Sequence, residues 1–397
     1  MNHVKDFHFW SPTEFVFGRN SEARVGEMLK RYDAKNVLIH YGGGSVVRSG
    51  LFDAIITQLD LEGIRYVALG GAKPNPRSSL VYEGIELARR SAVDFVLALG
   101  GGSAIDSAKA IAAGAMYPGD FWDFYSQKAV IEHALPIGVV LTIPAAGSEA
   151  SMSAVITKEE TMIKRGLVSR YYRPKFAIIN PEQGFSIPRY HLFAGVVDMM
   201  SHIFERYLTK TPDVVLTDRM SEAVLKTIIE AARVLKNHPR DYEAMATIFW
   251  AGTIAHNGIL GVGKDEDWSS HFLEHELSAL YDVSHGAGLA VIFPAFMRYT
   301  LMEDVMRYRN LAVNVFGVDD DPDDPVNTAL RGIETLKSFY REIGMPTHFK
   351  ELGAQKKDID RLIDTLRSHR GEVIGSFKKL SMDDVREIYL LATMEDD

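Results

Sequence analysis

The first half of the chain alternates short apolar runs with helical stretches, and this alternation restricts the fold more than any other feature. Apolar runs predict buried strands at residues 36–41, 66–69, 95–99, 137–142 and 176–179. Helical stretches separate the first three of these runs. Strand, helix and strand at this spacing are typical of a parallel sheet with helices on both faces. We therefore expect a doubly wound, Rossmann-like α/β domain.

The pattern changes after Pro188, where strand signals end and amphipathic helices dominate. Helices are predicted at residues 189–209, 214–236, 240–257, 268–280, 286–302, 326–343 and 381–393. Two prolines and a glycine between residues 181 and 188 mark the boundary. A chain of 397 residues is too long for one compact core. We therefore predict an α/β domain over residues 1–185 and an all-α domain over residues 186–397.

Charge and hydropathy limit the classes of partner. The net charge is −9 and no basic run is present, which argues against nucleic acid and anionic membranes as partners. No apolar stretch reaches the length of a membrane span. The first residues lack the apolar core of a signal peptide, so we expect a cytoplasmic protein.

The chain contains no cysteine. Disulfides, thiolate nucleophiles and zinc–thiolate sites are therefore excluded. Any metal ion must be held by nitrogen and oxygen atoms.

A glycine-rich turn, Gly100 to Asp106, closes the third predicted strand and opens a helix. Glycine lets the backbone approach a phosphate group closely, and the N–H groups and dipole of a helix start favour negative charge. The turn therefore predicts a phosphate site. The alternative is a tight strand-to-helix turn without a ligand, since the sequence is not the G-x-G-x-x-G pattern of dinucleotide-binding domains.

A second glycine-rich turn, Gly42-Gly43-Gly44-Ser45, follows the first predicted strand. This position usually meets the adenosine ribose, where an acidic residue would bind the 2′-hydroxyl and repel a 2′-phosphate. The chain has glycine and serine there, so we expect NADP(H) to be preferred, with NAD(H) possible.

Histidine and aspartate spacing in the second half predicts a metal site. Asp198 and His202 lie four residues apart on one predicted helix, as do His271 and His275 on another, and His285 follows after a turn. One carboxylate and several imidazoles suit Fe(II), Zn(II), Co(II), Ni(II) or Mn(II), and the spacing does not choose among them. Alone, each pair is more typical of a polar helix face. The other histidines, His256 among them, lack such partners and are assigned to surface or core.

With these segments in place, the chain resembles the iron-containing, group III alcohol dehydrogenases, in the branch of butanol dehydrogenases and aldehyde reductases. Matching segments follow one another in the family's order along essentially the whole chain. They are residues 15–19, 41–45, 74–76, 100–109 and 144–149, followed by Asp198, His202, His271, His275 and His285.

The resemblance implies a dehydroquinate synthase-like architecture in which the metal ion and the nicotinamide meet between the two domains. It implies that the metal ligands are Asp198, His202, His271 and His285. It places His275 beside the nicotinamide, where it is the candidate catalytic proton relay and not a ligand. It implies cofactor contacts from Gly43, Ser45, Asn75, Gly101, Gly102, Ser103, Asp106, Thr142, Ser148 and Lys164.

The function that follows is metal-dependent hydride transfer between NADP(H) and a primary alcohol or aldehyde, such as butanol and butyraldehyde. We expect Fe(II), with Zn(II) as the alternative, and a homodimer that acts on small molecules. Trp268 and Phe272 are candidates for the wall of an alcohol pocket or for plain helix core. Rival interpretations are a glycerol dehydrogenase-like or dehydroquinate synthase-like enzyme, a non-catalytic nucleotide or metal sensor, and a metal hydrolase.

Overall fold

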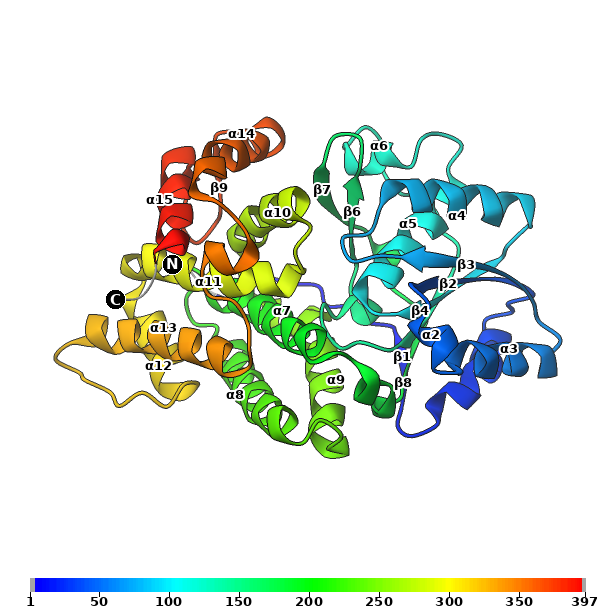
Figure 1. Ribbon diagram of the computed structural model, residues 1–397, viewed down its shortest axis with the longest axis horizontal. Helices are drawn as coiled ribbons and strands as arrows, with labels where there is room; N and C mark the ends of the chain where they lie inside the picture. Colours follow the sequence, from blue (N-terminus) through cyan, green and yellow to red (C-terminus); the bar gives the residue numbers. More distant parts are fainter. Residues whose placement is uncertain (1–3, 395–397) are drawn as a thin grey trace. The chain divides into compact units, whose positions relative to one another are not determined.

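The computed structural model describes residues 4–394, which divide into two compact units (Figure 1). One unit is Trp10–Ile187, and the other comprises, among the described residues, 4–9 and 188–394. The short N-terminal segment packs with the helical unit because the backbone N–H of Lys5 donates to the carbonyl oxygen of Gly263 over 2.9 Å. The sequence had placed this segment with the α/β domain.

The first unit is built on a six-stranded sheet with the order β1-β8-β5-β4-β2-β3. Every neighbouring pair of strands in it is parallel. The strands are β1 (Glu14–Phe17), β2 (Asn36–Gly42), β3 (Arg65–Ala72), β4 (Phe95–Gly100), β5 (Ile137–Leu141) and β8 (Phe176–Ile179). The expected doubly wound parallel sheet is therefore confirmed.

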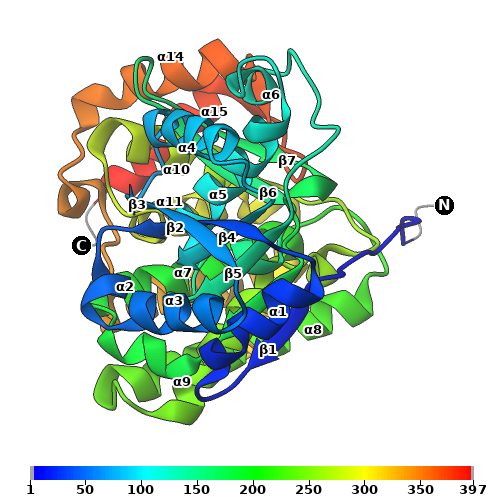
Figure 2. The same cartoon turned by 90° about the vertical axis from the view of Figure 1, so that its right-hand side faces the viewer.

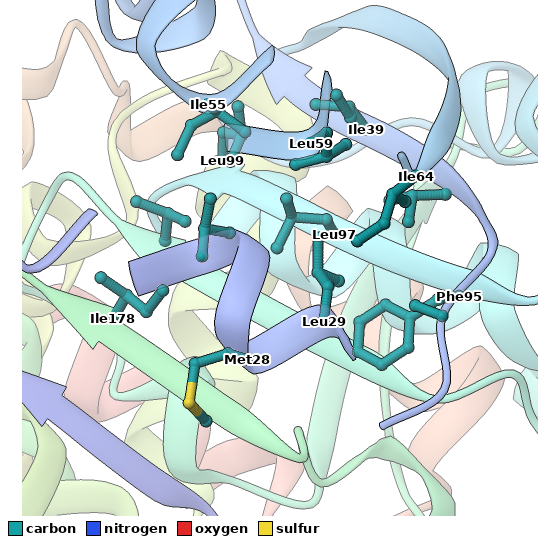
Figure 3. Close-up of a cluster of buried hydrophobic side chains, with 14 of the residues drawn as sticks. Met28, Leu29, Ile39, Ile55, Leu59, Ile64, Phe95, Leu97, Leu99 and Ile178 are labelled. Atoms are coloured by element: carbon teal, nitrogen blue, oxygen red, sulfur yellow. The ribbon is translucent and has the colours of Figure 1, made fainter. Parts of the chain in front are cut away.

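Helices cover both faces of this sheet, as Figure 2 shows. On β2, the side chains of Val37 and Ile39 point into one apolar cluster and that of Leu38 into another, because successive residues of a strand face opposite sides. In Figure 3, Met28, Leu29 and the neighbouring helix residues cover the first of these faces. The helices of the unit are α1 (Val25–Arg31), α2 (Ser45–Arg48), α3 (Leu51–Leu61), α4 (Ser78–Arg90), α5 (Gly102–Met116) and α6 (Trp122–Tyr125).

The strand order reverses between β2 and β4. The chain runs from β2 outward to β3, returns to β4 on the other side of β2, and then continues to β5. In open parallel sheets, ligands bind at the carboxyl ends of the strands where the order reverses. Both glycine-rich turns, after β2 and after β4, therefore lie at the position that this rule assigns to a nucleotide.

An antiparallel hairpin was not predicted from the sequence. It consists of β6 (Ser153–Lys158) and β7 (Ile163–Val168), which pair along their whole length. The hairpin supplies Lys164, one of the residues expected to contact the cofactor.

The second unit is helical and also contains one two-stranded antiparallel pair, β9 (Val373–Ile374) with β10 (Leu380–Ser381). All seven predicted helices are present. They are α7 (Arg189–Tyr207), α8 (Val215–Asn237), α9 (Tyr242–His256), α10 (Ser269–Tyr281), α11 (His285–Thr300), α13 (Pro325–Glu342) and α15 (Met382–Thr393). Two more, α12 (Val305–Asn314) and α14 (Ile359–Arg370), were not predicted. Among residues 4–394, no helix combines the length and hydropathy that crossing a bilayer requires.

Candidate functional site

Helix α7 carries Asp198 and His202 on one face, as their four-residue spacing predicts. Both are buried, with relative exposures of 5% each. Oδ1 of Asp198 lies 3.7 Å from Nδ1 of His202. The helix is buried along almost its whole length, so these polar groups point into the interior of the unit and not into solvent.

Helix α10 brings His271 to the same place. The carboxylate of Asp267 accepts a 2.8 Å hydrogen bond from the backbone N–H of Ser269 and so fixes the first turn of the helix. The imidazole rings of His271 and His202 stack with centroids 4.9 Å apart. His271 is also buried.

His285 is the first residue of α11, and a glycine next to it allows its approach. A Cβ atom on Gly286 would lie 1.8 Å from the backbone oxygen of Ala194, so only glycine permits α11 to start against α7. This contact places Nε2 of His285 3.8 Å from Oδ1 of Asp198. The side chain of His285 is 24% exposed, which makes it the most accessible of the four predicted ligands.

Asp198, His202 and His271 are spaced so that they could hold one divalent cation, and His285 adjoins them. Asp198, His202 and His271 each offer a ligand atom within 4.8 Å of the others. Tetrahedral ligands with metal bonds of about 2.1 Å lie about 3.4 Å apart, close to the spacing of Asp198 Oδ1 from the His202 and His285 nitrogens. The structure therefore brings together the four residues that the sequence singled out.

Two buried carboxylates contact the Nδ1 atoms of His271 and His285, and neither was predicted from the sequence. Glu205 Oε1 lies 2.7 Å from Nδ1 of His271. Glu274 Oε2 pairs with Nδ1 of His285. The signal that could have found them is their spacing, since Glu205 follows His202 by three residues and Glu274 follows His271 by three.

Burial sets the protonation of this cluster. It lowers the pKa of His202 well below 6.5, and positive charge at His256 and His271 would lower it further. A neutral imidazole is the form that binds a metal. Burial likewise raises the pKa of Glu205 well above its usual range, with the charge of Asp267 adding to the effect. A cation on the far side of the His271 ring would oppose that shift.

Aromatic groups border the cluster. His256, at the end of α9, stacks on His202 with a centroid distance of 4.1 Å, a contact that its position in the sequence did not predict. Trp268 packs edge-on against His271 at 5.0 Å. Phe272 instead contacts the guanidinium of Arg370, 3.9 Å from the ring centroid.

His275 lies at the edge of the cluster. Its ring centroid is 5.5 Å from that of His285 and 6.5 Å from that of His271. It groups with Glu274 and His285 and not with the set formed by Asp198, His202 and His271. The structure thus places His275 beside a predicted ligand and separates it from the main donor set.

In the α/β unit, the turn after β4 has the geometry of an anion site. Gly101 precedes the first residue of α5, and the helix extends over fifteen residues, Gly102–Met116. Gly101, Gly102 and Ser103 are half-buried at the start of this helix. The backbone N–H of Thr142 donates to the carbonyl oxygen of Gly100 over 3.0 Å, so the end of β5 adjoins the turn.

The turn after β2 is exposed at Gly43 and Ser45. Gly44 adopts φ +97°, a conformation that favours glycine. A Cβ on Gly44 would lie 3.3 Å from Nη1 of Arg48, whereas a Cβ on Gly43 would meet nothing within 4 Å. An exposed cation therefore adjoins the turn at which the adenosine ribose is expected.

Asp106 and Ser148 contact each other within the unit. The Ser148 hydroxyl donates to Asp106 Oδ1 over 2.6 Å, and the backbone N–H of Val155 donates to Oδ2 over 2.8 Å. The buried Lys109 ammonium group donates to Ser148 Oγ over 2.8 Å, and burial lowers its pKa to about 8. These bonds hold the loop around Ser148 against the start of α5.

Asn75 and Lys164, both predicted cofactor residues, are also neighbours. Lys164 Nζ donates to Asn75 Oδ1 over 3.0 Å, and both side chains are buried. Asn75 has φ +55°, a strained conformation that clusters at functional positions. The contact fixes the loop after β3 to the hairpin strand β7.

Comparisons with known proteins match nearly the whole chain. The family model described as "Iron-containing alcohol dehydrogenase" matches residues 12–181, and that of the "Fe-containing alcohol dehydrogenase family, C-terminal" matches residues 192–393. The probable NADH-dependent butanol dehydrogenase 1 of Bacillus subtilis (strain 168) is 43% identical over 385 residues, which cover 97% of this chain and 99% of the relative.

Two further proteins are similar over similar lengths. The NADPH-dependent aldehyde reductase YqhD of Escherichia coli (strain K12) is 35% identical over 393 residues, covering 97% of this chain and 99% of that protein. The crystal structure of NADH-dependent butanol dehydrogenase A from Thermotoga maritima superposes with a TM-score of 0.95 at 40% identity, covering 99% of this chain and 100% of the other.

Proposed function

Because the chain belongs to the iron-containing alcohol dehydrogenase family, we propose that it transfers hydride between NADP(H) and a primary alcohol or its aldehyde, such as butanol and butyraldehyde. The family membership and the relatives support alcohol and aldehyde oxidoreduction with a nicotinamide cofactor as its reaction class. The substrate, the cofactor preference and the metal dependence are the specific parts of the proposal.

The observation that carries the proposal is the buried group of Asp198, His202 and His271, whose ligand atoms lie within 4.8 Å of one another, with Nε2 of His285 3.8 Å from Oδ1 of Asp198. One carboxylate and three imidazoles would hold Fe(II), with Zn(II) as an alternative, because both accept nitrogen and oxygen donors. A divalent cation held there would act as a Lewis acid toward the carbonyl oxygen while the nicotinamide exchanges hydride with the adjacent carbon.

The α/β unit would bind the cofactor through groups at the carboxyl edge of its sheet. The backbone N–H groups of Gly101, Gly102 and Ser103 at the start of α5 would donate to the pyrophosphate. Thr142 adjoins this turn. Asp106 and Ser148, whose side chains bond each other, would contribute by holding the neighbouring loop in place.

Asn75 and Lys164 would act together. Their 3.0 Å hydrogen bond presents the Lys164 ammonium group from a fixed position in a buried setting. A cation held in this way favours a bound anion such as the cofactor's phosphate groups.

Preference for NADP(H) is proposed from the turn after β2. Gly43 and Ser45 carry no negative charge that would repel a 2′-phosphate, and the guanidinium of Arg48 adjoins Gly44. The relatives do not decide this point, since those named above include both NADH-dependent and NADPH-dependent proteins.

His275 would hold and pass on the proton exchanged between alcohol and aldehyde, through water or a ribose hydroxyl. Its ring lies 5.5 Å from that of His285, at the edge of the cluster, which supports a place near the reacting groups. Imidazole is suited to proton transfer at neutral pH.

We also propose a homodimer. Strand β1 is at the edge of the sheet, and the side chain of Phe17 on it is 40% exposed. An open, apolar edge strand is a surface that another copy of the chain could cover. Sedimentation equilibrium at micromolar concentration would give twice the monomer mass of 44.3 kDa, whereas a monomer mass would reject this part.

The specific proposal is tested by comparing kcat/KM for NADPH and NADH with a series of straight-chain aldehydes. A higher value for NADPH with butyraldehyde than with charged or highly hydroxylated aldehydes would support both the cofactor and the substrate. A NADPH to NADH ratio below one would contradict the cofactor preference.

A further inference from the structure

Two of the four proposed ligands, His271 and His285, each have a buried glutamate at Nδ1. Glu205 Oε1 lies 2.7 Å from Nδ1 of His271 and also accepts a 3.2 Å hydrogen bond from the backbone N–H of His271. Glu274 Oε2 pairs with Nδ1 of His285. An Nδ1 that donates to a carboxylate leaves Nε2 as the nitrogen available to a metal ion.

The two contacts connect three helices in sequence. Glu205 lies on α7, which carries Asp198 and His202, and it contacts the histidine of α10. Glu274 lies on α10, beside His271, and it contacts the histidine of α11. In this way α7 orients the ligand histidine of α10, and α10 orients the ligand histidine of α11.

The burial of these carboxylates needs a compensating interaction. Both side chains are completely inaccessible, with 0% exposure. A buried carboxylate is costly unless a positive or hydrogen-bonding partner offsets its desolvation. A histidine that donates from Nδ1 while a cation binds at Nε2 supplies such a partner.

The absence of a side chain at Gly288 leaves space for the carboxylate of Glu274. A Cβ on Gly288 of α11 would lie 2.6 Å from Glu274 Oε1. Glycine at this position therefore lets α11 pass close enough for His285 to reach Glu274. An alanine would displace the carboxylate without removing its charge.

We propose that Glu205 and Glu274 are positioning residues that fix the tautomer and the ring orientation of His271 and His285, and that they thereby set the affinity of the site for a divalent cation. This inference rests on the proposed function, because it takes both histidines as ligands. The observed position of His285 Nε2, 3.8 Å from Asp198 Oδ1, is the orientation that the Glu274 contact maintains.

The two glutamates also change the charge of the site. A divalent cation with Asp198 alone would carry a net charge of +1, and a carboxylate that accepts from Nδ1 of a ligand histidine places further negative charge near it. The imidazoles become more basic and bind the cation more firmly. Neutralising either glutamate should therefore weaken binding even where the fold is kept.

The test uses the metal-free full-length protein titrated with Co(II) and Zn(II) in competition with a chromophoric chelator. We compare Glu205→Gln and Glu274→Gln with the matched control Glu276→Gln. Glu276 is a buried glutamate on the same helix α10, but its partner is His369, at 2.9 Å. Dissociation constants should rise about 10- to 100-fold in the first two variants and stay within about twofold in the control. The visible spectrum of the Co(II) form should change in the first two only.

The outcomes separate this inference from the proposed function. Absence of Co(II) and Zn(II) binding by the wild-type protein would overturn both. Tight binding by the wild type and equally tight binding by both glutamine variants would overturn the positioning role alone. Equal weakening in the Glu276→Gln control would also contradict it, because the effect would then belong to any buried carboxylate of the helix.

Gly288→Ala keeps the test decisive if a glutamine variant does not fold. This variant retains both carboxylates, favours helix formation and places a methyl group 2.6 Å from Glu274 Oε1 and 2.7 Å from its Cγ, so the Glu274 side chain must shift. It should weaken Co(II) binding and alter the Co(II) spectrum in the same direction as Glu274→Gln. Wild-type affinity and spectrum in Gly288→Ala would refute the role of Glu274.

Discussion

Nδ1 of His271 lies 2.7 Å from Oε1 of Glu205, so a histidine of α10 is held by a carboxylate of α7. The same helix α7 carries Asp198 and His202. The candidate metal site is therefore part of the packing between helices and not a set of side chains added to a surface. Changes in the site should affect metal binding and leave the α/β unit intact.

Replacement of His271 by alanine should lower the affinity for the divalent cation by more than about 100-fold. Loss of a residue that only positions a ligand can already lower metal affinity by about 100-fold. NADPH should still bind, because its proposed phosphate contacts come from the other unit. Metal content after dialysis and NADPH fluorescence titration check the two statements. His191→Ala, an exposed histidine on the same helix as His202, is the control. Full metal content and activity in His271→Ala would reject the metal assignment.

Substitution of Gly43 by aspartate should reverse the cofactor preference. The carboxylate would repel a 2′-phosphate and accept a hydrogen bond from a 2′-hydroxyl. Because a Cβ at Gly43 meets nothing within 4 Å, the side chain fits without rearrangement. We expect the ratio of kcat/KM for NADPH to that for NADH to fall by about 10-fold or more, equivalent to about 1.4 kcal/mol. Gly43→Asn is the neutral control, and an equal fall in that variant would argue against an effect of charge.

Replacement of His275 by alanine should lower kcat by about 100-fold, the lower end of what a positioned acid or base contributes. Metal content should be unchanged, because the variant retains all four proposed ligands. His275→Gln keeps a polar side chain without a group that transfers protons near neutrality, and it should be as slow. Wild-type kcat in either variant would remove the relay role and leave His275 as a packing residue.

Acid should destabilise the α/β unit through His40. Its Nδ1 bonds to the carbonyl oxygen of Leu69 at 2.9 Å, and burial lowers the pKa of His40 from 6.5 to about 4. The unfolded chain therefore takes up the proton first as the pH falls below 6.5. This group contributes its full stability above that pH and loses about 2 kcal/mol by pH 5.

Urea unfolding at pH 7 and pH 5 measures this effect. In His40→Leu, the decrease in the free energy of unfolding between the two pH values should be smaller than in the wild type by about 2 kcal/mol. An identical decrease in the two proteins would show that His40 is not the group responsible.

Much of the fold was predictable because its strands and helices are long and regular. The five apolar runs of the α/β unit all became strands of one parallel sheet, and the seven predicted helices of the second unit are present. The hairpin β6–β7 was missed because Lys164 and Arg165 interrupt its apolar pattern. Helix α14 could have been found, since Ile359, Leu362 and Leu366 follow helical spacing and are buried.

The site could be predicted only where carboxylate or imidazole side chains also occur at helical spacing. Asp198 and His202 were found because their four-residue spacing occurs together with that of His271 and His275 and with the following His285. Glu205 and Glu274 were missed because glutamate in a helix is usually exposed, and their three-residue spacing from His202 and His271 was the only local signal of a role. The stacking of His256 on His202 depends on how α9 packs against α7, which no sequence pattern encodes.

The most direct test of the account is NADPH oxidation with butyraldehyde by protein loaded anaerobically with Fe(II), measured before and after treatment with a chelator. The account predicts turnover that the chelator abolishes and that added Fe(II) restores, while NADPH binding persists throughout. Turnover that survives complete removal of the metal would contradict the proposed role of Asp198, His202, His271 and His285.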